Sequence, residues 1–171
     1  MGSEMCIRDR IVEAPARVFE SQEEVKTAFR NNELNTDAII VVRFQGPKAN
    51  GMPELHGLTP ILAVLQDRGL KVALITDGRM SGASGKVPAA IHLSPEAANL
   101  GPISKIKNGD LIRLDARSGE LNILDENFEI RESRKKDLSE NERGLGRELF
   151  NIFRENATAC LLYTSPSPRD S

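Results

Sequence analysis

The sequence lacks several features that would assign it to particular protein classes. Among its 171 residues only two are cysteine and none is tryptophan, which excludes a disulfide-dense secreted scaffold. No apolar run approaches the roughly 20 residues that are needed to span a bilayer. A basic excess is also missing, because 23 Lys and Arg residues stand against 25 Asp and Glu residues. We therefore expect neither nucleic acid nor a membrane surface as a partner.

What remains is the composition of a globular domain. Hydrophobic residues make up 39% and charged residues 28% of the chain, which is a soluble rather than a disordered balance. The length suffices for one ordinary domain with its own core. The balanced charge is compatible with a cytoplasmic location, which we expect.

The two ends of the chain do not continue this pattern. Residues 1–10 and 160–171 contain both cysteines, and the second stretch has no hydrophobic periodicity. Both resemble the translated transposon-end adapter of sequencing libraries. The codons TGT CTC TTA TAC ACA TCT encode residues 160–165, and their reverse complement encodes residues 5–9 in another frame. We expect both ends to be non-native tails, and residues 11–159 to be a domain cut from a longer gene.

The first half of the interior predicts alternating strands and helices. Pro15 limits the extended segment 11–20 to a sheet edge or a bulge, because proline has no N–H to donate. A serine–glutamate capping box begins a helix at Ser21. A Thr-Pro pair begins a second helix over residues 59–68, which stops at a glycine. Two nearly all-apolar segments predict strands that are covered on both faces, at 38–44 and 71–76.

The second half of the interior predicts shorter strands separated by turns. They are expected near 89–93, 103–106, 111–115 and 120–124. The charged stretch 126–143 is expected to be a solvated excursion, and an amphipathic helix is expected at about 147–156. Closely spaced antiparallel strands after a β-α-β unit favour the α/β class, with a barrel-like mixed β-sheet and flanking helices.

Two loops that follow the buried strands are the expected places for chemistry. They cover residues 45–56 and 77–86, and such loops line the binding crevice of layered α/β proteins. Glycines in the second loop let backbone N–H groups approach an anion, with Arg79 and Lys86 available for charge. The Walker A pattern is not matched. An anion-binding loop and a plain turn are equally open on spacing alone.

Single residues within or near these loops have more than one interpretation. Glu54 is either a metal ligand or a carboxylate near a helix start. Ser81 is either a nucleophile or base, or a loop serine that bonds the backbone. Asp77 is either a helix cap or turn former, or a ligand of a bound group. His92 is expected at a partly buried position in an apolar strand. Residue types alone do not decide between these roles.

The order and spacing of several motifs favour one family. In chain order they are Gly46-Pro-Lys, Gly51-Met-Pro-Glu-Leu-His56, Leu58-Thr-Pro60, Asp67-Arg-Gly69, Asp77-Gly-Arg-Met-Ser-Gly82, and His92 with Ser94-Pro-Glu-Ala97. This set resembles the C-terminal part of the dihydroxy-acid dehydratase/phosphogluconate dehydratase family, through essentially the whole of residues 11–159. The variants Gly-Pro-Lys-Ala and Ser-Gly-Ala-Ser-Gly-Lys-Val-Pro are similar to its phosphogluconate branch.

The resemblance implies a fold and a reaction. The fold is the swivelling β/β/α C-terminal domain of these dehydratases. The reaction is the conversion of 6-phosphogluconate to 2-keto-3-deoxy-6-phosphogluconate and water in the Entner–Doudoroff pathway. It implies that Ser81, as an alkoxide, removes the C2 proton, and that Glu54 is a ligand of the Mg²⁺ that holds the substrate carboxylate. We further hypothesise that the substrate contacts Arg79, Ser84 and Lys86, the last two through its phosphate.

The resemblance also implies parts that this chain lacks. The family uses an iron–sulfur (4Fe–4S) cluster whose cysteine ligands, with other magnesium ligands, lie in an N-terminal domain, and its members are generally homodimers. The chain alone is therefore expected to be inactive. Two alternatives stay open at this point. One is a dehydratase of another sugar acid or dihydroxy acid, and the other is a non-catalytic barrel domain that binds a phosphorylated metabolite.

Overall fold

The computed structural model describes residues 11–80, 87–141, 143–144 and 147–157. Its strands are β1 (Ile11–Phe19), β2 (Ala38–Val42), β3 (Val72–Thr76), β4 (Ala89–Ala90), β5 (Leu111–Asp115) and β6 (Glu120–Ile123). Its α-helices are α1 (Gln22–Arg30), α2 (Pro47–Asn50), α3 (Leu58–Asp67) and α4 (Asn151–Glu155). Short 3₁₀ helices are η2 (Ala97–Asn99), η3 (Pro102–Lys105), η4 (Ser139–Asn141) and η5 (Arg147–Phe150).

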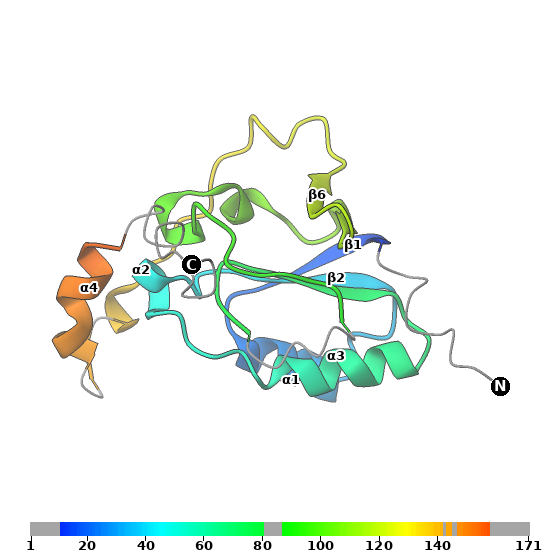
Figure 1. Ribbon diagram of the computed structural model, residues 1–171, viewed down its shortest axis with the longest axis horizontal. Helices are drawn as coiled ribbons and strands as arrows, with labels where there is room; N and C mark the ends of the chain where they lie inside the picture. Colours follow the sequence, from blue (N-terminus) through cyan, green and yellow to red (C-terminus); the bar gives the residue numbers. More distant parts are fainter. Residues whose placement is uncertain (1–10, 81–86, 142, 145–146, 158–171) are drawn as a thin grey trace, which may run out of the picture.

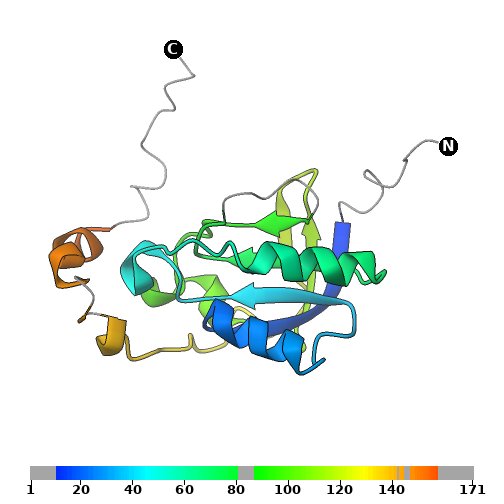
Figure 2. The same cartoon turned by 90° about the horizontal axis from the view of Figure 1, so that it is seen from below.

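The strands form one mixed sheet, in the order β4-β3-β2-β1-β5-β6. The pairs from β4 to β1 are parallel, whereas β5 pairs antiparallel with both β1 and β6. Helices α1 and α3 cover one face side by side, while β5 and β6 rise on the other side (Figures 1 and 2). The sheet is thus curled into a half-barrel with flanking helices, which confirms the predicted α/β class and barrel-like mixed sheet.

Strand β2 is buried throughout because both faces of the sheet are covered. Ala38, Ile40 and Val42 belong to the core under α1 and α3. Ile39 and Val41 belong to the opposite core, beneath the β5–β6 hairpin and η3. The alternation has the period of two that a strand imposes, and each fully buried valine or isoleucine contributes about 1.5–3 kcal/mol.

Pro15 was predicted to lie at a sheet edge or a bulge; β1 is a central strand, but the part of it that contains Pro15 is paired on one side only. The strand changes partners here: residues 11–15 pair with β5, and residues 16–19 pair with β2. The N–H of Ala16 donates to the Asp110 carbonyl at 2.8 Å, so the preceding nitrogen faces the side on which this part of β1 is unpaired. No ladder bond needs the missing N–H of proline.

The two covering helices begin differently. Helix α1 has the predicted N-cap, since Ser21 Oγ accepts from the N–H of Glu24 at 3.2 Å. Helix α3 starts earlier than predicted, because its N-cap is Gly57 rather than Thr59. The Thr59 hydroxyl instead donates to Met80 Sδ at 3.3 Å. This contact ties the first turn of α3 to the residues that follow β3.

Two predicted short strands differ in the structure. Residues 103–106 lie at the 3₁₀ helix η3, because Ile103 and Ile106 are three residues apart and both are buried in one core. The strand predicted at 89–93 is restricted to Ala89–Ala90. His92 follows it with a φ of 57° and is exposed, so its interpretation as a partly buried strand residue was wrong.

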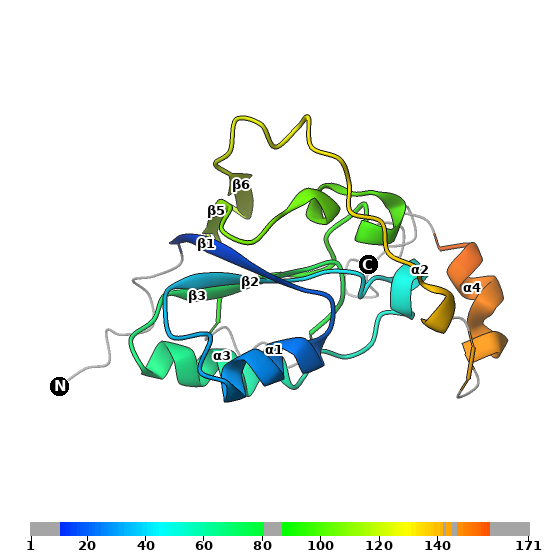
Figure 3. The ribbon, with the colours of Figure 1, turned by 180° about the vertical axis from the view of Figure 1, so that it is seen from behind.

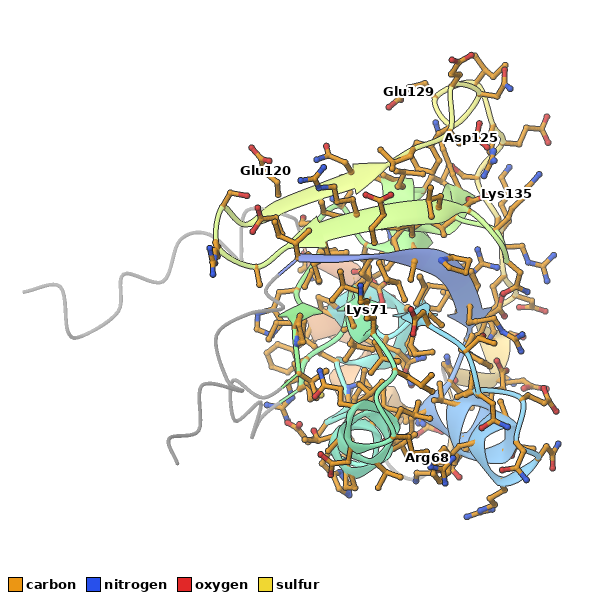
Figure 4. The ribbon with its side chains drawn as sticks, turned by 90° about the vertical axis from the view of Figure 1, so that its right-hand side faces the viewer. Arg68, Lys71, Glu120, Asp125, Glu129 and Lys135 are labelled. Atoms are coloured by element: carbon orange, nitrogen blue, oxygen red, sulfur yellow. The ribbon has the colours of Figure 1, made fainter. Side chains whose placement is uncertain are left out.

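The charged stretch after β6 is anchored at several points and is not a purely solvated excursion. Arg131 donates to Asp110 at 2.5 Å, and Phe128 is buried in the core. Lys136 Nζ lies 3.2 Å from Glu20 Oε2. Most other charged side chains here are exposed (Figure 4 labels Glu129 and Lys135). The predicted exposure therefore holds for most of the side chains, but the prediction did not include the contacts that anchor this stretch to the rest of the domain.

The last helical segment lies beside α2 (Figures 1 and 3). It consists of η5 and α4 in place of the single predicted helix. Arg147 donates to Asn50 Oδ1 at 3.4 Å, but Leu149 and Phe153 are largely exposed. Their helical spacing therefore does not reflect burial in a core. No helix of the described residues has the length and apolarity of a membrane span.

Candidate functional site

The predicted site loops lie next to each other because their strands are neighbours. Strands β2 and β3 pair in parallel, from Ala38 opposite Val72 to Val42 opposite Thr76. Their carboxyl ends therefore meet at one edge of the sheet, where ligands of α/β folds commonly bind. The first loop continues from β2 through α2, and the second begins directly after β3.

Glu54 and Arg79 join the two loops. They form an isolated parallel β-bridge, and the Leu55 N–H donates to the Arg79 carbonyl at 3.1 Å. Arg79 Nε donates to the Met52 carbonyl at 3.1 Å and lies 3.7 Å from Glu54 Oε2. The Glu54 side chain is 25% exposed and that of Arg79 is 54% exposed, so both reach solvent. An ion pair this exposed contributes little to stability, about 0–1 kcal/mol.

The alternative role of Glu54 at a helix start is wrong. Helix α3 begins only at Leu58, and its first turn contains no acidic residue. Glu54 instead lies in a backbone bridge, with its carboxylate beside the guanidinium of Arg79. The structure thus brings together two of the predicted site residues.

The other predicted site residues, Ser81, Ser84 and Lys86, lie outside the described residues. Their roles remain predictions. The residues on either side of this stretch, Met80 and Val87, are both buried in the core under α1 and α3.

Gly78 has a packing role. A Cβ at this position would lie 2.7 Å from Gln45 Cβ and 3.3 Å from Leu55 Cδ1. The missing side chain therefore lets the second loop pass close against the first. This contact explains one glycine of the 77–86 loop without an anion.

Asp77 has a role that the sequence analysis did not predict. It directly follows β3, is 0% exposed, and accepts backbone N–H bonds from Phe44 at 3.2 Å, Gln45 at 2.9 Å and Ala97 at 2.9 Å. Burial raises the pKa of the Asp77 carboxyl above its ordinary value, against the opposing effect of these donors. Asp77 thus holds three separate chain segments together.

Glu96 is a second buried carboxylate that sequence reasoning missed. It is 5% exposed and accepts from the N–H groups of Lys48 at 2.9 Å and Ala49 at 3.0 Å. Burial raises the pKa of the Glu96 carboxyl, and the nearby Asp77 carboxylate adds to this effect. Gly46 at the start of α2 has no side chain to cap the helix, but the sequence around it does not indicate that Glu96 is the residue that does so.

The described residues fit the two expected metal groups to different degrees. Glu54 offers carboxylate oxygens, and Mg²⁺ is commonly bound by one or two carboxylates together with water and substrate oxygens. Glu54 therefore fits one position of a magnesium site. Among the described residues, no group of three or more His, Cys, Asp and Glu side chains is arranged to hold a metal ion. An iron–sulfur cluster requires thiolates, and residues 11–157 contain no cysteine, so they do not fit as its ligands.

Comparison with known protein families supports the resemblance that the motifs in the two loops indicated. The profile described as "Dihydroxy-acid/6-phosphogluconate dehydratase C-terminal" matches residues 4–160. The chain belongs to this family. Membership confirms the resemblance that the motif order predicted. The matched residues include both loops at the carboxyl ends of β2 and β3.

Individual family members show how much of each protein this chain represents. Phosphogluconate dehydratase of Rhizobium meliloti (strain 1021) is 57% identical over 151 residues, which are 87% of this chain and 25% of that protein. Phosphogluconate dehydratase of Escherichia coli (strain K12) is 53% identical over 155 residues, 90% of this chain and 26% of that protein. Dihydroxy-acid dehydratase of Pyrococcus furiosus is 41% identical over 128 residues, 73% of this chain and 22% of that protein. The chain thus spans about a quarter of the length of the curated relatives it matches.

Proposed function

We propose that this chain is the C-terminal quarter of a hydro-lyase that converts 6-phosphogluconate to 2-keto-3-deoxy-6-phosphogluconate and water. The observation that carries the proposal is the bridge between Glu54 and Arg79, which joins the two motif loops at one sheet edge. The choice of substrate is supported by 57% identity to a protein named phosphogluconate dehydratase, against 41% to one named dihydroxy-acid dehydratase.

The reaction removes a proton from C2 and the hydroxyl from C3, which together make water, and the resulting enol becomes the ketone. The C2 proton beside a carboxylate is weakly acidic, so the negative charge that develops needs positive charge close by. We assign the base role to Ser81. A serine hydroxyl becomes an effective base only where cations and N–H donors stabilise its anion. Arg79, two residues earlier, brings a guanidinium to the same loop.

The remaining assignments concern binding. Glu54 would hold Mg²⁺ with its carboxylate, and the bound ion would supply Lewis acidity that stabilises negative charge developing on the substrate. Arg79 contacts the substrate, and Ser84 and Lys86 contact its phosphate, since lysine offers a charge and the loop offers N–H groups.

The proposal extends to the protein from which the chain comes. A preceding domain holds the 4Fe–4S cluster, the whole enzyme is a cytoplasmic homodimer, and residues 1–10 and 160–171 are non-native tails. These statements rest on family resemblance, on the quarter-length coverage of the relatives and on the DNA pattern at the two ends.

A chimera tests the proposed function directly. Residues 11–157 replace the matching quarter of the Rhizobium meliloti enzyme, and formation of the 2-keto acid is measured with 6-phosphogluconate and with gluconate. We expect turnover that depends on the phosphate. Ser81→Ala abolishes turnover and leaves the iron content unchanged, whereas Ser118→Ala, in the exposed β5–β6 turn, changes neither.

Each other outcome has a defined meaning. Retained turnover in Ser81→Ala removes this residue from the base role. A chimera with a full complement of iron but no turnover contradicts the proposed lyase. Phosphate-dependent binding of 6-phosphogluconate by calorimetry, again without turnover, favours the non-catalytic binding domain.

A further inference from the structure

Two buried carboxylates, Asp77 and Glu96, hold the first loop, which also carries the partly exposed Glu54. Asp77 is contributed by the end of β3, and Glu96 lies immediately before η2. Between them they accept five backbone N–H bonds, four of which come from residues 44–49. Hydrogen bonds from backbone N–H groups set the path of the chain and not only the conformation of one side chain.

Glu96 acts as a helix cap supplied from elsewhere in the chain. Gly46 is the N-cap of α2 and has no side chain, and Pro47 has no N–H. The next two N–H groups, of Lys48 and Ala49, are bonded by Glu96 Oε1 at 2.9 Å and Oε2 at 3.0 Å. Each carboxylate oxygen thus satisfies one donor at the helix start. The four-residue α2 owes its capped start to this distant side chain.

Asp77 fixes the point at which the first loop leaves β2. Its Oδ1 accepts from Gln45, and its Oδ2 accepts from Phe44 and from Ala97. Ala97 is the next residue after Glu96, so the bond to it also places the second carboxylate. The hydrogen bonds therefore form a closed ring of contacts. Asp77 bonds the first loop, the first loop bonds Glu96, and Ala97, next to Glu96, bonds Asp77 again.

The ring connects directly to the site bridge. After α2 the chain reverses through Gly51 and Met52, which have φ values of 68° and 58°. The reversal brings the Met52 carbonyl to Arg79 Nε, and Leu55 to the Arg79 carbonyl. Arg79 itself is two residues beyond Asp77. The position of Glu54 is thus set at one end by the capped α2 and at the other by the strand that carries Asp77.

We propose that Asp77 and Glu96 are positioning residues, which hold the loop so that the Glu54 carboxylate stands at the magnesium position beside Arg79. This inference rests on the proposed function for the identity of the metal. The positioning itself rests on the hydrogen bonds described above. Neither carboxylate is assigned a contact with the substrate or the metal.

Amide variants test the proposal with little change in size. Glu96→Gln and Asp77→Asn each replace one acceptor oxygen by an NH₂ group. This group is itself a donor, so it cannot accept the hydrogen bond of the backbone N–H that it faces. The control is Asp110→Asn, a buried carboxylate that accepts from the Lys107 N–H at 2.9 Å and from Arg131, neither of which belongs to the two loops. It reports the general cost of such a replacement.

Two measurements separate positioning from general stability. In the 171-residue chain, backbone hydrogen exchange is followed across residues 44–56. In the chimera, MgCl₂ binding is measured by calorimetry, and the MgCl₂ half-saturation of turnover is measured beside it. We expect faster exchange and a 10–100-fold weaker magnesium affinity in both site variants, as for other residues that orient metal ligands. Asp110→Asn leaves exchange in 44–56 and the magnesium affinity unchanged.

The outcomes distinguish this inference from the function on which it rests. Exchange in residues 44–56 that stays as in the unsubstituted chain, in both site variants, overturns the positioning role whatever the chimera does. An equal loss of magnesium affinity in Asp110→Asn also overturns it. A chimera that binds magnesium but does not turn over 6-phosphogluconate overturns the proposed function, while the exchange result still decides the positioning.

Discussion

Gly46→Ala should destabilise the fold because the added methyl group meets the buried carboxylate of Glu96. A Cβ built at Gly46 would lie 2.4 Å from Glu96 Oε2, 2.7 Å from its Cδ and 2.8 Å from its Cβ. The backbone itself accepts alanine, since the φ of Gly46 is −68°. The cost therefore arises from displacement of the carboxylate from the start of α2.

The size of the effect follows from the bonds that the carboxylate makes. It accepts from the N–H groups of Lys48 and Ala49, and a hydrogen bond to a charged group contributes about 1.5–3 kcal/mol. We expect a loss of about 3–6 kcal/mol in the free energy of unfolding if both bonds break. The loss is about 1.5–3 kcal/mol if a rotated carboxylate keeps one of them.

Gly57→Ala is the matched control. Gly57 is also a helix N-cap without a capping side chain, and its φ is also −68°. Its Cβ would meet Lys26 Cε at 2.7 Å, the far end of a flexible side chain that can move away. Both substitutions remove the same glycine freedom from the unfolded chain, so that contribution largely cancels between the two variants. We expect Gly57→Ala to change the unfolding free energy by less than about 1 kcal/mol.

Urea denaturation of the 171-residue chain and both variants measures the difference, provided that the m-values agree. A Gly46→Ala variant as stable as Gly57→Ala would refute the reasoning, because the carboxylate would then have room that the structure denies it. The same substitution in a Glu96→Ala background removes two of the three close contacts. Its cost should fall there by at least about 1 kcal/mol, as expected for residues that share a contact.

Three further changes test other parts of the fold. Glu20→Gln should lower the free energy of unfolding by about 1.5–3 kcal/mol at neutral pH. Burial opposes ionisation of Glu20, but its cationic neighbours hold the pKa of its carboxyl below the ordinary 4.5. The stability that the carboxylate contributes is therefore present above pH 4.5, and the difference in unfolding free energy between variant and parent, measured with urea, should narrow as the pH falls below 4.5. A gap that widens below pH 4.5 would contradict this sign. Ser21→Ala should lower the free energy of unfolding by about 1 kcal/mol through loss of the α1 cap. Ser118→Ala, in an exposed turn, should lower it by less than about 0.5 kcal/mol. Equal losses in the two variants would show that the Ser21 cap does not stabilise α1. Gly101→Ala should abolish folding as judged by circular dichroism, because its Cβ would lie 1.7 Å from the Pro95 carbonyl oxygen, and a folded variant would show that this contact relaxes.

The strand pattern was predictable from local sequence wherever burial was two-sided or alternating. The buried strands β2 and β3 appear where apolar runs predicted them, and α1 begins at its Ser21 cap. The prediction failed where tertiary contacts set the conformation. Ile103 and Ile106 suit a strand by composition, but one shared core at a spacing of three makes them part of a 3₁₀ turn. The edge predicted for Pro15 is only local, because β1 as a whole is a central strand that changes partners beside this residue.

Residue types and motif order, by themselves, indicated the family, the two candidate site loops and the candidate residues Glu54 and Arg79. These features are local, because each motif is read within a few residues and its neighbours follow in fixed order. Only the tertiary structure brought Glu54 against Arg79 and assigned Asp77 and Glu96 to the first loop. Their donors lie 32 and 47 residues away along the chain, at Gln45 and Ala49. A buried carboxylate must find its hydrogen-bond donors wherever the fold places them, and no local pattern records that choice.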